Sequence, residues 1–264
     1  MPSWSNWSGS VTATPRELVE PATEADVVEL VRTAGADGTC VRIAGAGHSF
    51  TPLVATDGVI ASLGGIRGLT EVDAPGREVE ILAGTPIHAL GPLLAEHGLA
   101  LINQGDIDRQ AIGGACGTGT HGTGAAFTSF SGVVTGATVV VASGDVVRCD
   151  ASNEPSLFRA AQLSLGGVGV VTRLRLRVRD AFSLHEREWS EPLDECMDRL
   201  DEHIAATRHF EFWWFPGIDK SWCKSLDEVV DEPDTVAGSD HERFGASGDI
   251  FPSDRDDRFN EMEY

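Results

Sequence analysis

Short apolar runs and alternating segments are spread along the chain, and they predict strands interleaved with a few helices. Apolar positions at helical spacing after Thr23, a residue type that caps helices, predict a helix over residues 24–35. Residues 133–142 and 145–149 alternate around a Ser-Gly-Asp turn, which predicts a hairpin. Further strands are expected at residues 40–44, 59–63, 78–83, 100–103, 170–178 and 210–215.

Three more helices are expected between these strands. A helix should open at Pro86, run to about residue 97 and end at Gly98, since proline suits a first helical turn and glycine suits a helix end. Residues 154–163 and 193–206 show the spacing of amphipathic helices. Because the short strands do not alternate regularly with helices, the pattern predicts an α+β fold and not a regular βαβ series.

Composition narrows the class of protein. The chain of 264 residues is 41% hydrophobic, enough to bury a core, yet no run approaches the roughly 18 apolar residues of a membrane span. Its 41 acidic and 20 basic side chains give a net charge of −21, which disfavours binding to double-stranded nucleic acid. The five cysteines contain no C-x-x-C pair, so the spacing indicates neither a disulfide framework nor a zinc site.

The excess of acid is concentrated near the C-terminal end. Residues 1–180 have a net charge of −6, whereas residues 181–264 have a net charge of −15. The segment 228–257 is polar, acidic and without periodicity, which favours disorder. Only Lys220 and Lys224 are lysines among the basic residues. An acid-rich, lysine-poor surface suits concentrated salt, where self-repulsion is screened, although an ordinary acidic tail is the alternative. The first ten residues lack the pattern of a signal peptide, so we expect a cytoplasmic protein.

Two glycine-rich segments are the main candidates for a binding site. Residues 45–50 (Gly-Ala-Gly-His-Ser-Phe) directly follow a predicted strand, where glycines let backbone N–H groups approach a phosphate. Residues 113–122 contain a G-x-G-x-x-G pattern. That pattern is a weak indication of a nicotinamide-binding Rossmann unit, because the preceding strand ends near Asn103 and no crossover helix follows.

Four segments in order resemble the flavin-binding domain of the aldonolactone and alditol oxidases, in the vanillyl-alcohol oxidase superfamily. Residues 6–9 (Asn-Trp-Ser-Gly) resemble the family's N-W-x-G opening, and residues 41–50 resemble its G-x-G-H-S signature. Residues 113–122 resemble its G-T-G-T-H-G turn, and residues 166–172 resemble its G-x-x-G-V-[VI]-T strand entry. The resemblance implies a PCMH-type FAD-binding domain of two α/β subdomains over residues 1–180, with FAD as the cofactor.

The resemblance also implies roles for individual residues. His48 stands where many members attach FAD covalently, from a ring nitrogen to the flavin 8α-methyl carbon, whereas a histidine that only hydrogen-bonds beside a tight turn is the alternative. The resemblance places His121 in the wall of the flavin site, and the alternative is a turn histidine packed against glycines. The diphosphate would be held by Gly45, Ala46, Gly47 and Ser49. The opposite wall of the flavin site would be formed by Gly114, Gly117, Thr118, Thr120, His121 and Gly122, with Val170 near the flavin or adenine. Arg109 and Gln110 are weaker candidates.

The resemblance weakens toward the C-terminus. Residues 210–216 and 258–264 look like pieces of the family's cap domain, which binds substrate, so residues 181–264 are expected to form an incomplete α+β cap. The family's H-W-x-K stretch is not found in this sequence, and no catalytic acid or base is assigned. The expected function is an FAD-dependent oxidoreductase that takes hydride from a sugar alcohol or aldonolactone. A shortened, non-catalytic flavin-binding protein that needs a partner chain, and an NAD(P)-dependent Rossmann dehydrogenase, are the alternatives.

Overall fold

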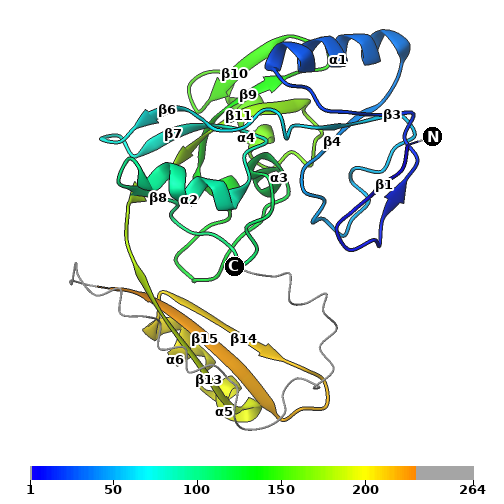
Figure 1. Ribbon diagram of the computed structural model, residues 1–264. Helices are drawn as coiled ribbons and strands as arrows, with labels where there is room; N and C mark the ends of the chain where they lie inside the picture. The colour runs from blue at the N-terminus through cyan, green and yellow to red at the C-terminus, as the bar shows by residue number, and fades with distance from the viewer. Residues whose placement is uncertain (1, 230–264) are drawn as a thin grey trace. The chain divides into compact units, whose positions relative to one another are not determined.

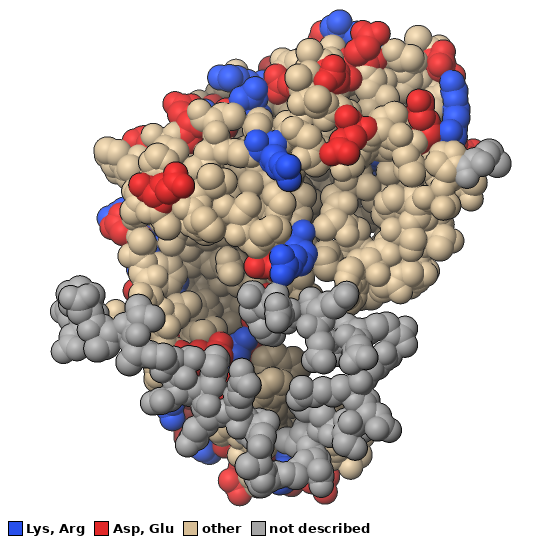
Figure 2. Space-filling model, in the orientation of Figure 1, with Lys and Arg blue, Asp and Glu red and all other residues tan. Residues whose placement is uncertain are grey.

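The computed structural model describes residues 2–229 of the chain (Figure 1). The acidic segment expected over residues 228–257 lies outside the described residues except for its first two positions, and the segment 258–264 lies wholly outside them. Every helix within residues 2–229 is too short or too polar to span a lipid bilayer. On the face shown in Figure 2, acidic and basic side chains are interspersed, with no continuous basic patch among the residues described.

A small parallel sheet and one helix form the N-terminal layer. The sheet has the order β3 (Glu17–Val19), β5 (Val59–Ser62), β4 (Val41–Ala44). Helix α1 (Glu24–Asp37) begins after Thr23 as expected. Its first turn is closed by a capping box, in which Thr23 Oγ1 accepts a hydrogen bond from Asp26 N and Asp26 Oδ2 accepts one from Thr23 N. A two-stranded ribbon, β1 (Trp4–Ser5) and β2 (Thr12–Ala13), precedes this layer.

An antiparallel sheet of five strands forms the centre of the larger body. Its order is β10-β9-β11-β7-β6. The predicted hairpin is confirmed, because β9 and β10 pair antiparallel with Val140 opposite Val146. The strand expected over residues 170–178 is also confirmed as the central strand of the sheet. The bounds are β6 (Leu69–Asp73), β7 (Glu78–Leu82), β9 (Val134–Val140), β10 (Val146–Asp150) and β11 (Val170–Arg177).

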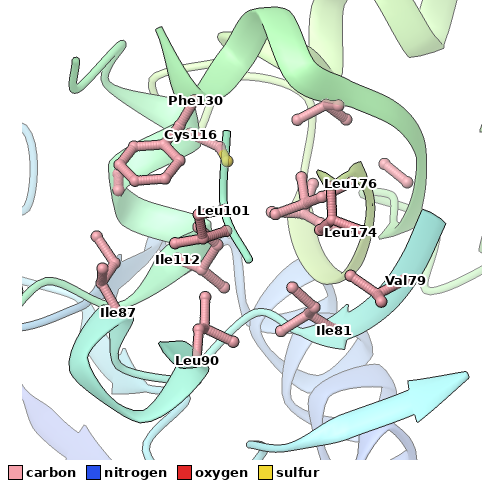
Figure 3. Close-up of a cluster of buried hydrophobic side chains, with 14 of the residues drawn as sticks. Val79, Ile81, Ile87, Leu90, Leu101, Ile112, Cys116, Phe130, Leu174 and Leu176 are labelled. Atoms are coloured by element: carbon pink, nitrogen blue, oxygen red, sulfur yellow. The ribbon is translucent and has the colours of Figure 1, made fainter. Parts of the chain in front are cut away.

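Helices cover one part of this sheet and enclose the main hydrophobic core. Figure 3 shows Ile112 and Cys116 of α3 in the same buried cluster as Ile81 of β7 and Leu174 and Leu176 of β11. Because burial of such side chains contributes about 1.5–3 kcal/mol each, this core holds α3 firmly against the sheet. The helices are α2 (Ile87–Ala95), α3 (Ile112–Gly117), the 3₁₀ turn η1 (Phe130–Val133) and α4 (Pro155–Gln162).

A second antiparallel sheet follows the larger body in the sequence. It has the order β13 (Leu184–Pro192), β15 (Lys220–Glu228), β14 (His209–Trp214), and α5 (Leu193–Asp198) and α6 (Leu200–Ala206) pack on one of its faces (Figure 1). Strands β8 (Leu99–Ala100) and β12 (Arg179–Asp180) form a separate short pair. The proposed division of the chain at residue 180 stays a prediction.

Several elements differ from the expectations. The helix expected over residues 193–206 is two helices, because Arg199 leaves helical geometry at φ −103°, ψ 9°. Cys196 of α5 and His203 of α6 are both buried. Of the strand expected at residues 100–103, only Ala100 is in a strand, since β8 consists of Leu99 and Ala100. Pro86 lies before α2, in extended geometry, and not inside its first turn.

Candidate functional site

The first glycine-rich turn leaves the carboxyl end of β4 and is held from behind by the N-terminal segment. Trp7 N donates to Gly47 O at 2.9 Å, and Asn6 Nδ2 donates to Ser49 O at 3.0 Å. Gly47 has φ +75°, a region that favours glycine. Within residues 2–229 no backbone carbonyl or side chain accepts a hydrogen bond from the N–H groups of residues 46–49. The turn therefore presents a row of backbone donors suited to an anion.

The side chain of His48 is half-buried beside this turn. Its imidazole stacks on the indole of Trp7, with ring centroids 5.3 Å apart and planes inclined by 21°. Burial lowers the pKa of His48 below its ordinary value, because removal from water disfavours the charged form. The ring is therefore neutral at pH 7 and keeps a nitrogen lone pair that can act as a nucleophile.

The second glycine-rich segment forms α3 and the turn after it. Gly113 lets the helix approach the sheet, since a Cβ there would lie 2.8 Å from Ala83 Cβ. By contrast, a Cβ added at Gly114 or Gly117 would meet no atom within 4 Å. Thr118 Oγ1 donates to Gly114 O at 2.9 Å and so closes the last turn of the helix. The two open glycines leave the exposed side of α3 free of side chains.

A cavity of about 630 Å³ lies between the two glycine-rich segments. This volume falls within the range of about 300–1,000 Å³ that is typical of ligand and cofactor sites. Although the chain carries a large negative charge, no acidic side chain lines the cavity among the residues described, and Arg42 and Arg109 are its cationic lining residues. The cavity thus offers backbone donors, open glycines and positive charge to an anionic ligand.

The structure brings most of the predicted site residues together. The cavity is lined by Gly45, Ala46, Gly47, His48, Ser49, Gly114, Gly117, Thr118, Thr120 and Val170. His121 and Gly122 do not line it. His121 is exposed, with Nδ1 2.9 Å from Gly122 O, and a Cβ at Gly122 would lie against Gln104 O. In this structure Gly122 therefore serves close packing of two backbone segments, and a flavin contact for either residue stays a prediction.

Two residues that were weaker candidates in the sequence also line the cavity. Arg109 and Gln110 precede Ala111, the N-cap residue of α3, and line the cavity. Gln110 Oε1 is buried and has no hydrogen-bond partner within the described part of the chain. A buried amide oxygen without a partner costs about 1–3 kcal/mol, so a ligand N–H group is a fitting partner for it. The glycines of α3 hide the helix in the sequence, so nothing in the sequence places Arg109 and Gln110 beside a helix start.

The strands around the second glycine-rich segment are not arranged as in a Rossmann unit. The strand before the second glycine segment, β8, pairs antiparallel with β12, and the strand after it, β9, pairs antiparallel with β10 and β11. A Rossmann unit needs parallel strands joined by a helix. The backbone donors of residues 46–49 suit a diphosphate, and the open surface of α3 leaves room for a planar ring system.

Comparison with known families agrees with the geometry. Residues 15–150 match the family model described as FAD binding domain, and residues 174–245 match the model described as D-arabinono-1,4-lactone oxidase. The fold resembles that of cholesterol oxidase from B. sterolicum, with a TM-score of 0.77 and 23% identity over 88% of this chain and 48% of that one.

Curated relatives extend the same likeness. An L-gulono-1,4-lactone dehydrogenase of Mycobacterium tuberculosis is 36% identical over 237 residues, 90% of this chain and 55% of the relative. A D-arabinono-1,4-lactone oxidase of Eremothecium gossypii is 34% identical over 219 residues, 81% of this chain and 41% of the relative. The chain spans about half the length of the curated relatives it matches. Because the FAD-binding model matches more than half of its residues, the chain belongs to the family of FAD-binding domains.

Proposed function

We propose that the protein is an FAD-dependent oxidoreductase that oxidises a CH–OH group of a sugar alcohol or an aldonolactone. The observation that carries the proposal is the cavity of about 630 Å³ between two glycine-rich segments, lined by free backbone donors and by no described acidic side chain. The names of the relatives, a gulonolactone dehydrogenase and an arabinonolactone oxidase, support this substrate class.

The residues around the cavity suggest how FAD would be held. The N–H groups of residues 46–49 would donate to the diphosphate, and the Arg42 and Arg109 side chains would offset its charge. Gly114 and Gly117 would allow the ligand to approach the backbone of α3. Gln110 Oε1 would accept a hydrogen bond from a ligand N–H group. Bound FAD would supply an acceptor for the hydride that leaves the substrate carbinol carbon.

We also propose that His48 attaches the flavin covalently. Support comes from its position in the cavity wall, its neutral ring and the stacking on Trp7, which holds the imidazole in one orientation. The new bond joins a ring nitrogen to the 8α carbon and replaces one C–H and one N–H bond. Two protons and two electrons leave, and the electron acceptor of the enzyme, oxygen or another oxidant, takes the electrons.

We also propose that the protein works in a salt-rich cytoplasm. The net charge of −21 and the scarcity of lysine support work in a salt-rich cytoplasm. A small polyol or lactone is the expected partner, in keeping with the names of the relatives. The cationic residues on the face in Figure 2 are interspersed with acids, which disfavours nucleic acid as a partner. The residues that would remove the hydroxyl proton are not assigned within the described chain.

Anaerobic reduction tests the proposal. The flavin-loaded protein would be mixed in high salt with L-gulono-1,4-lactone, D-arabinono-1,4-lactone and a panel of sugar alcohols, and flavin absorbance would be followed. At least one compound should bleach the flavin, and a later addition of oxygen or an artificial acceptor should restore the colour. If dithionite bleaches the flavin but no polyol or lactone does, the protein binds flavin without this activity.

A further inference from the structure

Four side chains able to bind metals converge inside the second sheet and its helices. Glu191 is the next-to-last residue of β13, Cys196 lies on α5, His203 lies on α6 and Cys223 lies on β15. None of the four lines the cavity described above. The donor atoms of Glu191, Cys196 and Cys223 all lie within 4.8 Å of one another. The cluster is therefore separate from the proposed flavin site.

The distances in this cluster match those between ligands of one tetrahedral ion. Cys196 Sγ and Cys223 Sγ are 3.7 Å apart, and Cys223 Sγ lies 3.5 Å from Glu191 Oε1. With Zn–S bonds of about 2.3 Å and a Zn–O bond of about 2.0 Å at tetrahedral angles, the expected separations are about 3.8 Å for two sulfurs and about 3.5 Å for sulfur and oxygen. Two of the three separations thus match those around a zinc ion, and the third, between Cys196 Sγ and the Glu191 carboxylate, is within 4.8 Å.

The surroundings are those of a buried site. Cys196 and Cys223 are each 0% exposed, and the Glu191 side chain is 10% exposed. His203 Nε2 lies 3.1 Å from Glu191 Oε1, and its ring stacks on Phe210 at 4.7 Å. A histidine held on a liganding carboxylate is the outer partner that metal sites use to orient a ligand. The carboxylate is thus fixed where a third ligand is needed.

We propose that Cys196, Cys223 and Glu191 bind one zinc ion, with His203 as the positioning residue for the carboxylate. Thiolate ligands in a tetrahedral arrangement select zinc over calcium or magnesium. Two thiolates, one carboxylate and Zn²⁺ sum to a charge of −1. Arg199 Nη1 lies 3.5 Å from Glu191 Oε2 and offsets that charge. The ion would connect β13, α5 and β15 and so stabilise this part of the fold.

Metal binding must displace protons here. Zinc binds cysteine as the thiolate, so the side chains of Cys196 and Cys223 must give up their protons when the ion enters. Zinc binding would therefore release protons, and zinc affinity would fall as the pH is lowered. His203 would contribute through the orientation of Glu191, and its loss should weaken zinc binding by about 10–100-fold.

Metal analysis of the full chain tests this proposal. Protein from zinc-supplemented medium would be dialysed against metal-free high-salt buffer and examined by mass spectrometry for metal content and by zinc-edge X-ray absorption. We expect about one zinc per chain, with two sulfur scatterers and oxygen or nitrogen in the first shell. Flavin absorbance does not interfere with either measurement.

Variants separate a zinc site from a pair of packed thiols. Cys196→Ala and Cys223→Ala should each lose the zinc, whereas Cys149→Ala, a buried cysteine in the other sheet, should keep it. His203→Gln should keep the fold, by circular dichroism, and bind zinc 10–100-fold more weakly. The wild-type protein alone decides the matter if the alanine variants fail to fold. A wild-type chain that neither contains nor takes up zinc, or a Cys196–Cys223 disulfide in the intact mass of freshly purified protein, would overturn the proposal.

Discussion

The indole of Trp7 stacks on the imidazole of His48 at 5.3 Å, while the backbone N–H of the same Trp7 donates to Gly47 O at 2.9 Å. One residue of the N-terminal segment thus supports both the turn and the proposed attachment residue. The N-W-x-G opening and the G-x-G-H-S signature, which are distant in sequence, act here as one structural unit.

Removal of the Trp7 ring should slow covalent attachment. Trp7→Ala leaves His48 in place but frees its ring to rotate, and loss of orientation should slow bond formation by at least about tenfold. In-gel flavin fluorescence of denatured protein, followed over time after FAD addition, measures the covalent fraction. The control is Trp214→Ala, which removes an exposed indole from the second sheet. Equal rates in the two variants would show that the stacking has no role.

Burial of His48 gives stability a specific pH dependence. Burial lowers the pKa of His48 below 6.5, so just below pH 6.5 the unfolded chain binds more protons than the folded chain. The free energy of unfolding should therefore fall as the pH falls through this window. His48→Gln should show a shallower slope than the wild type in denaturant unfolding from pH 7 to pH 5, both measured without flavin. Identical slopes would mean that His48 titrates as in the unfolded chain.

A substitution at Gly114 tests whether the cavity binds FAD, because the variant is expected to fold like the wild type. A Cβ at Gly114 meets no atom within 4 Å, so Gly114→Val should fold, while its side chain would occupy the cavity. FAD affinity in a fluorescence titration should fall by at least about tenfold, which is about 1.4 kcal/mol. Gly91→Val in α2 is the matched control, since its Cβ also meets nothing and Gly91 lies outside the cavity lining. Unchanged affinity in Gly114→Val would place the ligand elsewhere.

Asn6 should matter for the first turn although it does not line the cavity. Its buried side chain donates to Ser8 Oγ, Ser10 Oγ and Ser49 O and accepts from Val11 N. Asn6→Ala leaves the N–H of Val11 and the carbonyl of Ser49 without partners, so the free energy of unfolding should fall by about 1–3 kcal/mol. Calorimetry measures this loss, and Asn153→Ala at an exposed turn offers a comparison. An effect no larger than in Asn153→Ala would show that this network is dispensable.

Salt should stabilise the folded chain. With a net charge of −21 the compact state repels itself, and the Debye length shrinks from about 10 Å at 0.1 M salt to about 3 Å at 1 M. The melting temperature should therefore rise by several degrees between these concentrations. Potassium chloride and sodium chloride should act alike if screening is the cause. A melting temperature that stays constant or falls would contradict adaptation to salt.

Local signals made much of the fold predictable. The capped helix after Thr23 and the hairpin around Gly144 depend on neighbouring residues, and both were correctly anticipated. Helix α3 was not, because its glycines have low helix propensity and its stability depends on the burial of Ile112, Ala115 and Cys116, which the sequence does not reveal. The cluster around Cys196 and Cys223 was hidden because its members come from four elements and follow no short metal-binding spacing.

The candidate site was predictable to the extent that it lies in the two glycine-rich segments. His121 matches a motif yet is exposed and does not line the cavity, since motif spacing does not fix the direction of a turn side chain. Gln110 shows the opposite case. Its unpartnered buried oxygen is visible only when the packing around it is known.

The flavin content of the purified chain tests most directly whether the cavity between the glycine segments holds FAD. Protein made with ample riboflavin and purified in high salt would be precipitated with acid, and the visible spectrum of the redissolved pellet would be compared between wild type and His48→Ala. We predict about one flavin per chain, retained in the wild-type pellet and released into the supernatant in His48→Ala. A wild-type chain that is colourless and binds no added FAD would contradict the assignment of this cavity.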